Sequence, residues 1–194
     1  MDTGTSLSTG SNLMNDNAII WKPDADRQQA SAMYRFMQLH GFDDYDALHR
    51  WSVDDSPAFW EALCDFCQIL FDRAADTTLA RPDDIMDAGW FEGSQLNFAA
   101  HMLRHTGAAP AIVFCGEDGA RKELSRDDLR VAVAGVAAAL RSSGVTKGDR
   151  VVGYLPNCPE AIVAMLATTS IGAIWSSCSP DFGVNGVVDR FGQI

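Results

Sequence analysis

Two short patterns in this sequence have a spacing that is found in metal-binding or redox-active residues. His101 and His105 lie four residues apart, and Cys64 and Cys67 form a Cys-x-x-Cys pair. A zinc site needs further ligands, and neither pattern has a second Cys or His pair at ligand spacing. A redox Cys-x-x-Cys usually opens a helix after a strand, whereas this pair lies inside an amphipathic helical pattern. We therefore predict no metal site, and we expect the two cysteines to pack in a core.

Nucleophilic and phosphate-binding motifs are also absent from the sequence. Ser176 and Ser177 end an apolar run, but no general base can be assigned to them, and there is no G-x-S-x-G turn. The sequence has neither a G-x-x-x-x-G-K-[ST] loop nor a G-x-G-x-x-G loop after a strand. Paired acids such as Asp127 and Asp128 stand at predicted helix starts, where capping and the helix dipole explain them. Residue types alone therefore indicate no reaction centre.

The block of residues 147–180 indicates where a ligand would bind. Apolar runs at Val151–Leu155 and Ala173–Ser177 flank a helical stretch that begins with a proline and ends before a glycine. This pattern is typical of a strand–helix–strand crossover, which makes the two strands parallel. Ligands of such sheets bind at the carboxyl ends of the strands. The loops Pro156–Cys158 and Cys178–Gly183 are therefore the predicted ligand-facing edge.

Upstream of this block the pattern also alternates between strands and helices. Turn residues at 116–119 separate two short runs that are predicted to pair as a hairpin, and Ser125-x-x-Asp128 is a capping box at the start of a long helix. The second half therefore has the order β, β, α, β, α, β, α, and its two crossovers between buried strands predict a parallel sheet. The predicted strands are 111–115, 120–124, 151–155 and 173–177, and the predicted helices are 125–142, 158–170 and 184–194.

The first half is predicted to be mainly helical. Asp24 caps a helix that runs to about His40, and Ser56 begins a helix whose apolar residues recur at helical spacing. Ser52-x-x-Asp55, just before it, is predicted to form a shorter capping turn. The other predicted elements are a mobile tail over 1–17, a short helix over 43–49, an irregular connector over 77–93 and a helix over 96–105.

Composition excludes several classes of partner. The formal net charge of −11 repels nucleic-acid phosphates and anionic membranes, so we expect neither as a partner. The longest apolar stretches are far shorter than the about 20 residues of a membrane span. The first residues have no basic region followed by an apolar one, as a secretory signal would. The five cysteines are then expected to be reduced thiols of a cytoplasmic protein.

Three separated segments carry a resemblance to one enzyme superfamily, the adenylate-forming acyl-CoA synthetases. The first resembles the N-terminal helical cap of its acetyl- and acetoacetyl-CoA synthetase branch, and the second resembles the start of that branch's large domain. The third is similar to the superfamily's crossover block. The segments are Trp51-Ser52-Val53 followed by Phe59-Trp60, then WFEGSQLNFA at 90–99, then GDRVV, PNCPEA, AMLA and GA within 148–173. The resemblance covers about residues 20–194.

Within that branch the segment WSSCSPDFG at 175–183 is similar to the acetoacetyl-CoA synthetases. Acetyl-CoA synthetases usually carry a glycine pair, near the pantetheine arm of CoA, where Pro180 and Asp181 stand here. The resemblance implies that Ser179, Pro180 and Asp181 form a loop on the CoA or substrate side. The alternative is that these residues simply turn the chain after a strand. No catalytic residue and no metal ligand is implied within this sequence.

The resemblance also implies an activity for a full-length relative. Acetoacetate attacks the α-phosphate of Mg·ATP to give an acyl-adenylate, and the CoA thiol then displaces AMP. The family uses a Ser/Thr/Gly-rich phosphate loop, an aromatic-Thr-Glu segment, a ribose-binding Asp and a Lys on a mobile C-terminal domain. None of these has a match in residues 1–194. We therefore expect the chain to be inactive alone, with ATP, Mg²⁺ and CoA needed only by a full-length relative.

Two alternatives stay open at this point. The acid could be acetate or propionate, because substrate choice rests mostly on residues beyond Ile194. The chain could instead be a non-catalytic interaction module whose open sheet edge pairs with a separate chain. The predicted architecture is α/β, with an N-terminal helical cap and the first part of a parallel or mixed sheet with crossover helices, as in an incomplete adenylate-forming large domain. The predicted divisions are a tail at 1–17, the cap at 18–89 and the start of the AMP-binding domain at 90–194.

Overall fold

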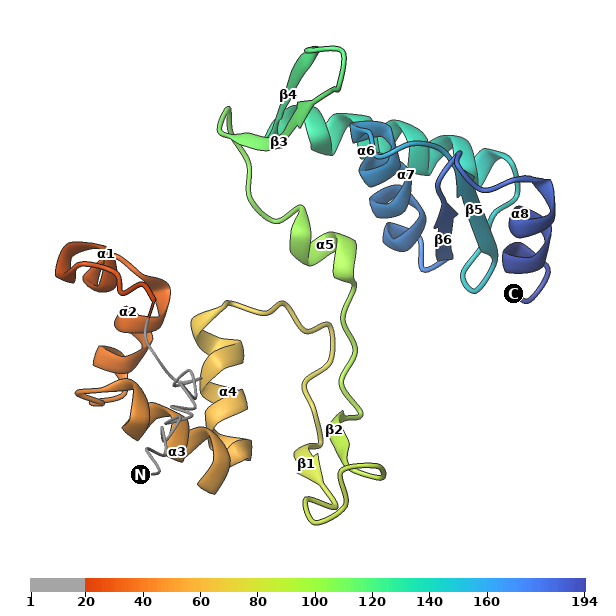
Figure 1. Ribbon diagram of the computed structural model, residues 1–194. Coiled ribbons are helices and arrows are strands. Elements are labelled where there is room, and N and C mark those ends of the chain that lie inside the picture. The colour runs from red at the N-terminus through yellow and green to blue at the C-terminus, as the bar shows by residue number, and fades with distance from the viewer. Residues whose placement is uncertain (1–19) are drawn as a thin grey trace, which may run out of the picture. The chain divides into compact units, whose positions relative to one another are not determined.

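The computed structural model describes residues 20–194, so the tail predicted over 1–17 lies outside the described residues. Contacts divide the described residues into two compact units, residues 20–55 and Ser56–Ile194. Figure 1 shows the helices of the first unit and the mixed helices and strands of the second. The α/β class and the order of elements predicted for the second half are confirmed.

The described residues of the first unit form three helices: α1 (Ala25–Gln29), α2 (Ala32–Leu39) and α3 (Tyr45–Asp54). The single helix predicted from Asp24 to His40 is wrong, because Ser31 adopts an extended backbone and begins a new helix. Its Oγ accepts a hydrogen bond from the Tyr34 backbone N–H at 3.1 Å. The capping turn predicted at Ser52 is also wrong. Ser52 lies inside α3, where its hydroxyl donates to the His49 carbonyl.

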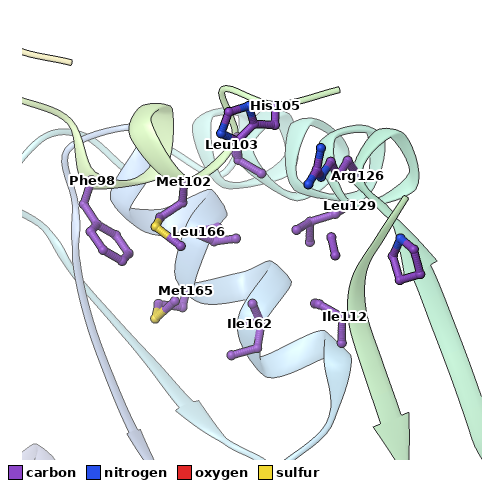
Figure 2. Close-up of a pocket in the computed structure, with 12 residues that line it drawn as sticks. Phe98, Met102, Leu103, His105, Ile112, Arg126, Leu129, Ile162, Met165 and Leu166 are labelled. Carbon is purple, nitrogen blue, oxygen red and sulfur yellow. The ribbon is translucent and has the colours of Figure 1, made fainter. Parts of the chain in front are cut away.

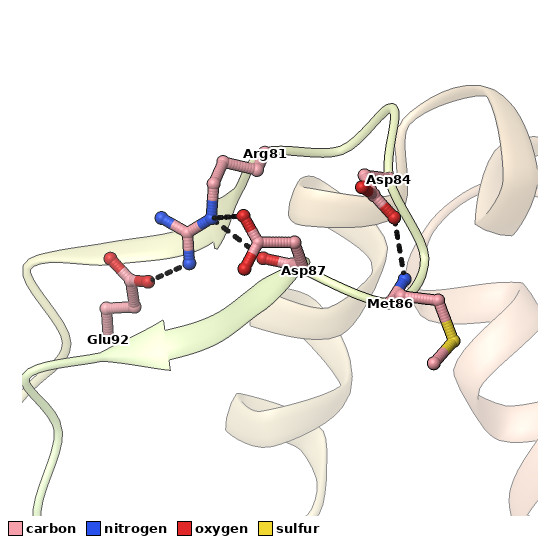
Figure 3. A network of polar contacts seen from close by, with 5 residues as sticks. All are labelled: Arg81, Asp84, Met86, Asp87 and Glu92. Atoms are coloured by element: carbon pink, nitrogen blue, oxygen red, sulfur yellow. Dashed lines mark hydrogen bonds and ion pairs between the residues drawn. The ribbon is translucent and has the colours of Figure 1, made fainter.

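The second unit begins with α4 (Ser56–Phe66) and an antiparallel hairpin of β1 (Thr77–Ala80) and β2 (Gly89–Glu92). The irregular connector predicted over 77–93 is therefore wrong. Each strand has only four residues, too few to show alternation in the sequence. Figure 3 shows Arg81 joined to Glu92 and to Asp87 in this hairpin. Its guanidinium lies 2.6 Å from Glu92 Oε1 and 3.2 Å from Asp87 Oδ2.

The rest of the second unit follows the predicted order closely. The helix predicted over 96–105 is shorter, because Asn97 caps it and it ends at Met102. The capping box of Ser125 and Asp128 is confirmed at the start of the long helix. The elements are α5 (Phe98–Met102), β3 (Pro110–Cys115), β4 (Arg121–Ser125), α6 (Arg126–Ser142), β5 (Arg150–Tyr154), α7 (Pro159–Ser170), β6 (Ile174–Cys178) and α8 (Val184–Phe191).

Sheet pairing confirms one of the two predicted crossovers. Strands β5 and β6 are parallel and connected through α7. Strands β3 and β4 form the predicted hairpin, but this hairpin is a separate sheet, so α6 does not join two strands of one sheet. The hairpin turn at 116–119 lets these two strands satisfy each other's hydrogen bonds locally.

The core of the second unit lies between helices. Its buried residues come from α5, α6 and α7, and they are Ala99, Leu129, Val133, Ala137, Val163, Leu166 and Ala167. The parallel strands are more open than predicted: Val152 is 47% exposed and Ile174 is 49% exposed. Helix α7 connects β5 to β6. Within the described chain, each of these two strands has an outer edge that pairs with no other strand. The helical layer is therefore closed while the sheet side is open.

Candidate functional site

The carboxyl ends of β5 and β6 meet at one level. Tyr154 is paired with Cys178, and Gly153 is paired with Ser177, so the two following loops start side by side. A hollow of about 330 Å³ lies there. It is lined by Leu155, Pro156, Asn157, Ala161, Ile162, Met165, Trp175, Ser177, Cys178 and Ser179. The structure thus brings together the two loops that the crossover pattern predicted.

Gly153 shapes the floor beneath this hollow. A Cβ atom at position 153 would lie 2.5 Å from Trp175 Cη2 and 2.5 Å from Leu155 Cδ2. The close approach of the indole ring to the β5 backbone therefore requires glycine at this position. None of the residues that line the hollow carries a charge, so it suits an uncharged or apolar group better than a phosphate chain.

The predicted loop residues occupy different positions around the hollow. Ser179 lines it, whereas Pro180 and Asp181 do not. The Ser179 hydroxyl donates to Asp181 Oδ2 at 2.7 Å, and the Phe182 backbone N–H donates to the Ser179 carbonyl at 3.1 Å. Pro180 and Asp181 therefore form a turn that is closed by its own hydrogen bonds.

Two residues that the sequence reasoning missed hold this turn. The Tyr154 hydroxyl lies 2.8 Å from the Pro180 carbonyl oxygen and 2.9 Å from the Phe182 carbonyl oxygen. A hydroxyl has one proton, so it donates to one of these carbonyls at a time. The Arg190 guanidinium on α8 lies 4.4 Å from the centre of the Phe182 ring. A tyrosine as the last residue of an apolar strand was the only sequence signal for this contact.

A larger apolar groove adjoins the hollow. Its volume is about 430 Å³, and Figure 2 shows its walls of Phe98, Met102, Ile112, Leu129, Met165 and neighbouring side chains. Ile162 and Met165 of α7 line both the groove and the hollow. The two cavities therefore share one wall, and together they form an extended apolar surface beside the strand ends.

Polar contacts fix the two ends of α7. At its C-terminal end, Asn97 Nδ2 donates to the carbonyls of Thr169 and Ser170 at 3.1 and 3.3 Å. At its N-terminal end, Lys122 Nζ lies 2.8 Å from Glu160 Oε1. This hydrogen bond, followed by bonds from the backbone of Glu160 and the side chain of Cys158, lowers the pKa of the Glu160 carboxyl. The wall of the hollow is thus held at both ends.

The histidine and cysteine patterns do not form a metal site in residues 20–194, where no cluster of three potential ligands occurs. His101 Nε2 lies 2.9 Å from an Arg104 nitrogen, and partial burial, followed by the charges of Arg104 and His105, lowers its pKa. Cys64 and Cys67 are free thiols. Cys64 is half-buried, and burial raises its pKa, but Cys67 is exposed, so core packing is wrong for that residue.

Two protein-family models match this chain. A model of the AMP-binding enzyme family matches residues 98–192, and a model of the acetyl-coenzyme A synthetase N-terminus matches residues 45–102. Together they span about three quarters of the chain. The chain belongs to the acyl-CoA synthetases among the AMP-binding enzymes. The hollow and the groove both lie within the AMP-binding match, and Ile162 and Met165, the wall they share, do as well.

Individual relatives define the branch. The chain is 45% identical to an acetoacetyl-coenzyme A synthetase of Rhizobium meliloti (strain 1021), over 90% of this chain and 28% of the relative. It is also 45% identical to an acetoacetyl-CoA synthetase of Macaca fascicularis, over 91% and 27%. The structure of the Streptomyces lividans acetoacetyl-CoA synthetase matches with a TM-score of 0.80 and 41% identity, over 90% of this chain and 28% of that chain.

The chain thus spans little more than a quarter of the length of these relatives and corresponds to their N-terminal portion. The resemblance seen in the three sequence segments is confirmed. No helix in the described residues is long and apolar enough to cross a membrane.

Proposed function

We propose that this chain is the N-terminal part of an acetoacetate–CoA ligase. The observation that carries the proposal is the 0.80 TM-score, at 41% identity, with the Streptomyces lividans acetoacetyl-CoA synthetase over 90% of the chain. In the complete reaction, acetoacetate attacks the α-phosphate of Mg·ATP, pyrophosphate leaves, and the CoA thiolate displaces AMP from the acyl-adenylate. Charge develops at phosphorus in the first step, so catalysis needs cationic groups around the phosphates.

In this proposal residues 1–194 supply a scaffold and one wall of the site. The uncharged hollow at the strand ends suits the acyl or pantetheine side of the reaction, and the turn at Ser179, Pro180 and Asp181 borders that side. The cationic and phosphate-binding groups come from regions that correspond to the rest of the relatives. The chain alone is then inactive, and only the full-length enzyme uses ATP, Mg²⁺ and CoA. We also propose the divisions 18–89 and 90–194 and a cytoplasmic location.

A pair of assays tests this function. The purified chain, incubated with acetoacetate, ATP, Mg²⁺ and CoA, is expected to form no acetoacetyl-CoA, and turnover above a protein-free blank would contradict the proposal. A chimera in which this chain replaces the matching portion of the Streptomyces lividans enzyme is expected to restore thioester formation. A folded but inactive chimera would argue against the ligase role. Parallel reactions with acetate and propionate distinguish acetyl- or propionyl-CoA synthetase as the source.

A second candidate function is an interaction module that pairs with a separate chain. The observations that favour it are the open apolar groove, in which Phe98 and Met102 are 50% and 52% exposed, and the unpaired outer edges of β5 and β6 among the described residues. The expected partner is a polypeptide equivalent to the remaining region of the relatives. Expressing that region of the Streptomyces lividans enzyme as a separate chain and mixing the two tests the idea. Co-elution in size-exclusion chromatography, lost in Met165→Asp, is the expected outcome, and independent elution would refute it.

A further inference from the structure

A cleft in the first unit has a chemical character that the proposed ligase function does not use. Its volume is about 450 Å³, and it lies among α1, α2 and the start of α3. Its lining includes the aromatic residues Trp21, Tyr34 and Tyr45 and the acidic residues Asp43 and Asp44. Aromatic faces next to carboxylates are the combination that recognises organic cations.

Local hydrogen bonds fix the walls of this cleft. The side chain of Asp44 accepts from the Ala47 backbone N–H at 2.8 Å, which sets the start of α3 beside Tyr45. Ser31 caps α2 through the Tyr34 N–H. Gln28 Nε2 donates to the Pro23 carbonyl at 2.6 Å, which ties the segment before α1 to that helix. The aromatic side chains therefore project from backbone that is held in place before any ligand arrives.

The cleft already holds one cation against an aromatic face. The Arg27 guanidinium carbon lies 5.5 Å from the centre of the Trp21 ring. Across the described part of the chain Arg27 makes no ion pair, and its charged group lies against the ring instead. Residues 20–55 carry seven acidic and four basic side chains, so the surrounding field also attracts positive charge.

We propose that this cleft binds an organic cation of the alkylammonium or guanidinium type. Trp21 and the two tyrosines supply ring faces, and Asp43 and Asp44 supply the opposite charge. Residues 1–19 contain no Lys or Arg, so a basic side chain for this cleft cannot come from that segment. The cation is then either a small free ammonium compound or a basic side chain from outside residues 1–19. Arg27 occupies the Trp21 face as an internal competitor.

Binding of matched probes to the full chain tests the charge requirement. Choline and its uncharged isostere 3,3-dimethylbutan-1-ol would be titrated with tryptophan fluorescence and calorimetry as readouts. Choline or Nα-acetyl-lysine methylamide is expected to saturate at about millimolar concentration, with the neutral compound at least about fivefold weaker. Preference for the lysine derivative identifies a basic side chain as the source, and preference for choline identifies a small free ammonium compound. Binding of neither cation, or equal binding of the neutral isostere, overturns the proposal.

Variants of the cleft residues distinguish a cation site from an anion site. Arg27→Ala removes the internal competitor and is expected to tighten cation binding about threefold, whereas an anion site would lose affinity. Asp43→Asn should weaken binding about threefold and Trp21→Ala about tenfold, with Trp21→Phe retaining part of it. Asp46→Asn is the matched control, because this acid lies on α3 but does not line the cleft. Weaker binding in Arg27→Ala would overturn the cation assignment, and none of these outcomes depends on the ligase proposal.

Discussion

The helical layer of α5, α6 and α7 and the β1–β2 hairpin belong to the same unit but are stabilised in opposite ways. The layer buries seven apolar residues in one cluster. The hairpin has one buried residue, Thr78, and its Arg81 forms ion pairs with side chains that are 43% and 72% exposed. Burial contributes about 25 cal/mol per Å² of apolar area, whereas an exposed ion pair contributes about 0–1 kcal/mol. The stability that supports the candidate site should therefore come from the helices.

Helix α7 contains the same contrast between two positions one turn apart. Leu166 is 3% exposed within the core, and Ile162 is 37% exposed where it lines the hollow. The Ile162 end of this stripe is left for a ligand or for further polypeptide. Substitutions in the helical layer and in the hairpin test this contrast, from the largest expected effect to the smallest.

Leu166→Ala should cost about 3 kcal/mol of unfolding free energy, because its side chain is 3% exposed within the core. Ile162→Ala, one turn earlier on the same helix, should cost about 1 kcal/mol, since its side chain remains partly in water. Urea unfolding followed by circular dichroism measures both. Equal losses for the two variants would mean that the two positions do not differ in burial as the structure describes.

Asn97→Ala should cost about 1–2 kcal/mol. The change removes the cap of α5, in which Asn97 Oδ1 accepts from the Ala100 N–H at 2.9 Å, and leaves two α7 carbonyls without this donor. The same unfolding experiment measures the loss. Asn157→Ala, in the exposed loop after β5, serves as the control and should leave the free energy of unfolding nearly unchanged. A comparable loss in this control would show that the Asn97 hydrogen bonds are not the cause of the effect.

Ser125→Ala removes the cap of α6 and should lower the free energy of unfolding by about 1 kcal/mol at neutral pH. It should also change how that free energy depends on pH in the acid range. The Ser125 hydroxyl, followed by its backbone N–H, lowers the pKa of Asp128. A carboxyl with a lowered folded pKa contributes stability above its unfolded pKa, and this is lost as the pH falls through the folded pKa. In the variant the Asp128 pKa should rise toward its ordinary value in an NMR titration. An unchanged Asp128 pKa in the variant would show that the capping box does not lower it.

Arg81→Gln should have the smallest effect, at most about 0.5 kcal/mol, because its ion pairs are solvent-exposed. Adding salt should remove most of the difference from the wild type, since screening acts on exposed charges. Arg141→Gln on α6, which makes no ion pair among the described residues, is the control. A loss of several kcal/mol in Arg81→Gln would show that the hairpin is not weakly held.

Sequence reasoning was most reliable where the signal lies within a few residues. The capping box at Ser125, the proline that begins α7 and the crossover between β5 and β6 are all confirmed. Reasoning was least reliable where a feature depends on distant pairing. The β1–β2 hairpin, which closes across the loop 81–88, was not predicted, and the predicted β3–β4 hairpin does not join the parallel sheet.

The same division applies to the candidate site. The order of elements predicted which two loops would meet, because parallel strands end on the same side of a sheet. It did not predict that Ser179 lines the hollow while Pro180 and Asp181 turn away, or that Tyr154 holds that turn. The Tyr154 contacts join residues more than twenty positions apart along the chain.

The amino-acid sequence by itself determined the family, the order of elements and the position of the strand-end loops. Helix caps, helix-breaking residues and family-like motifs each depend on residues that are close together in the sequence. Only the tertiary structure decided that β1 pairs with β2, that the β3–β4 hairpin is separate from the parallel sheet, and which aromatic and acidic side chains surround the cleft in the first unit. The physical reason is that burial and pairing are set by segments that are distant along the chain and meet only in the fold.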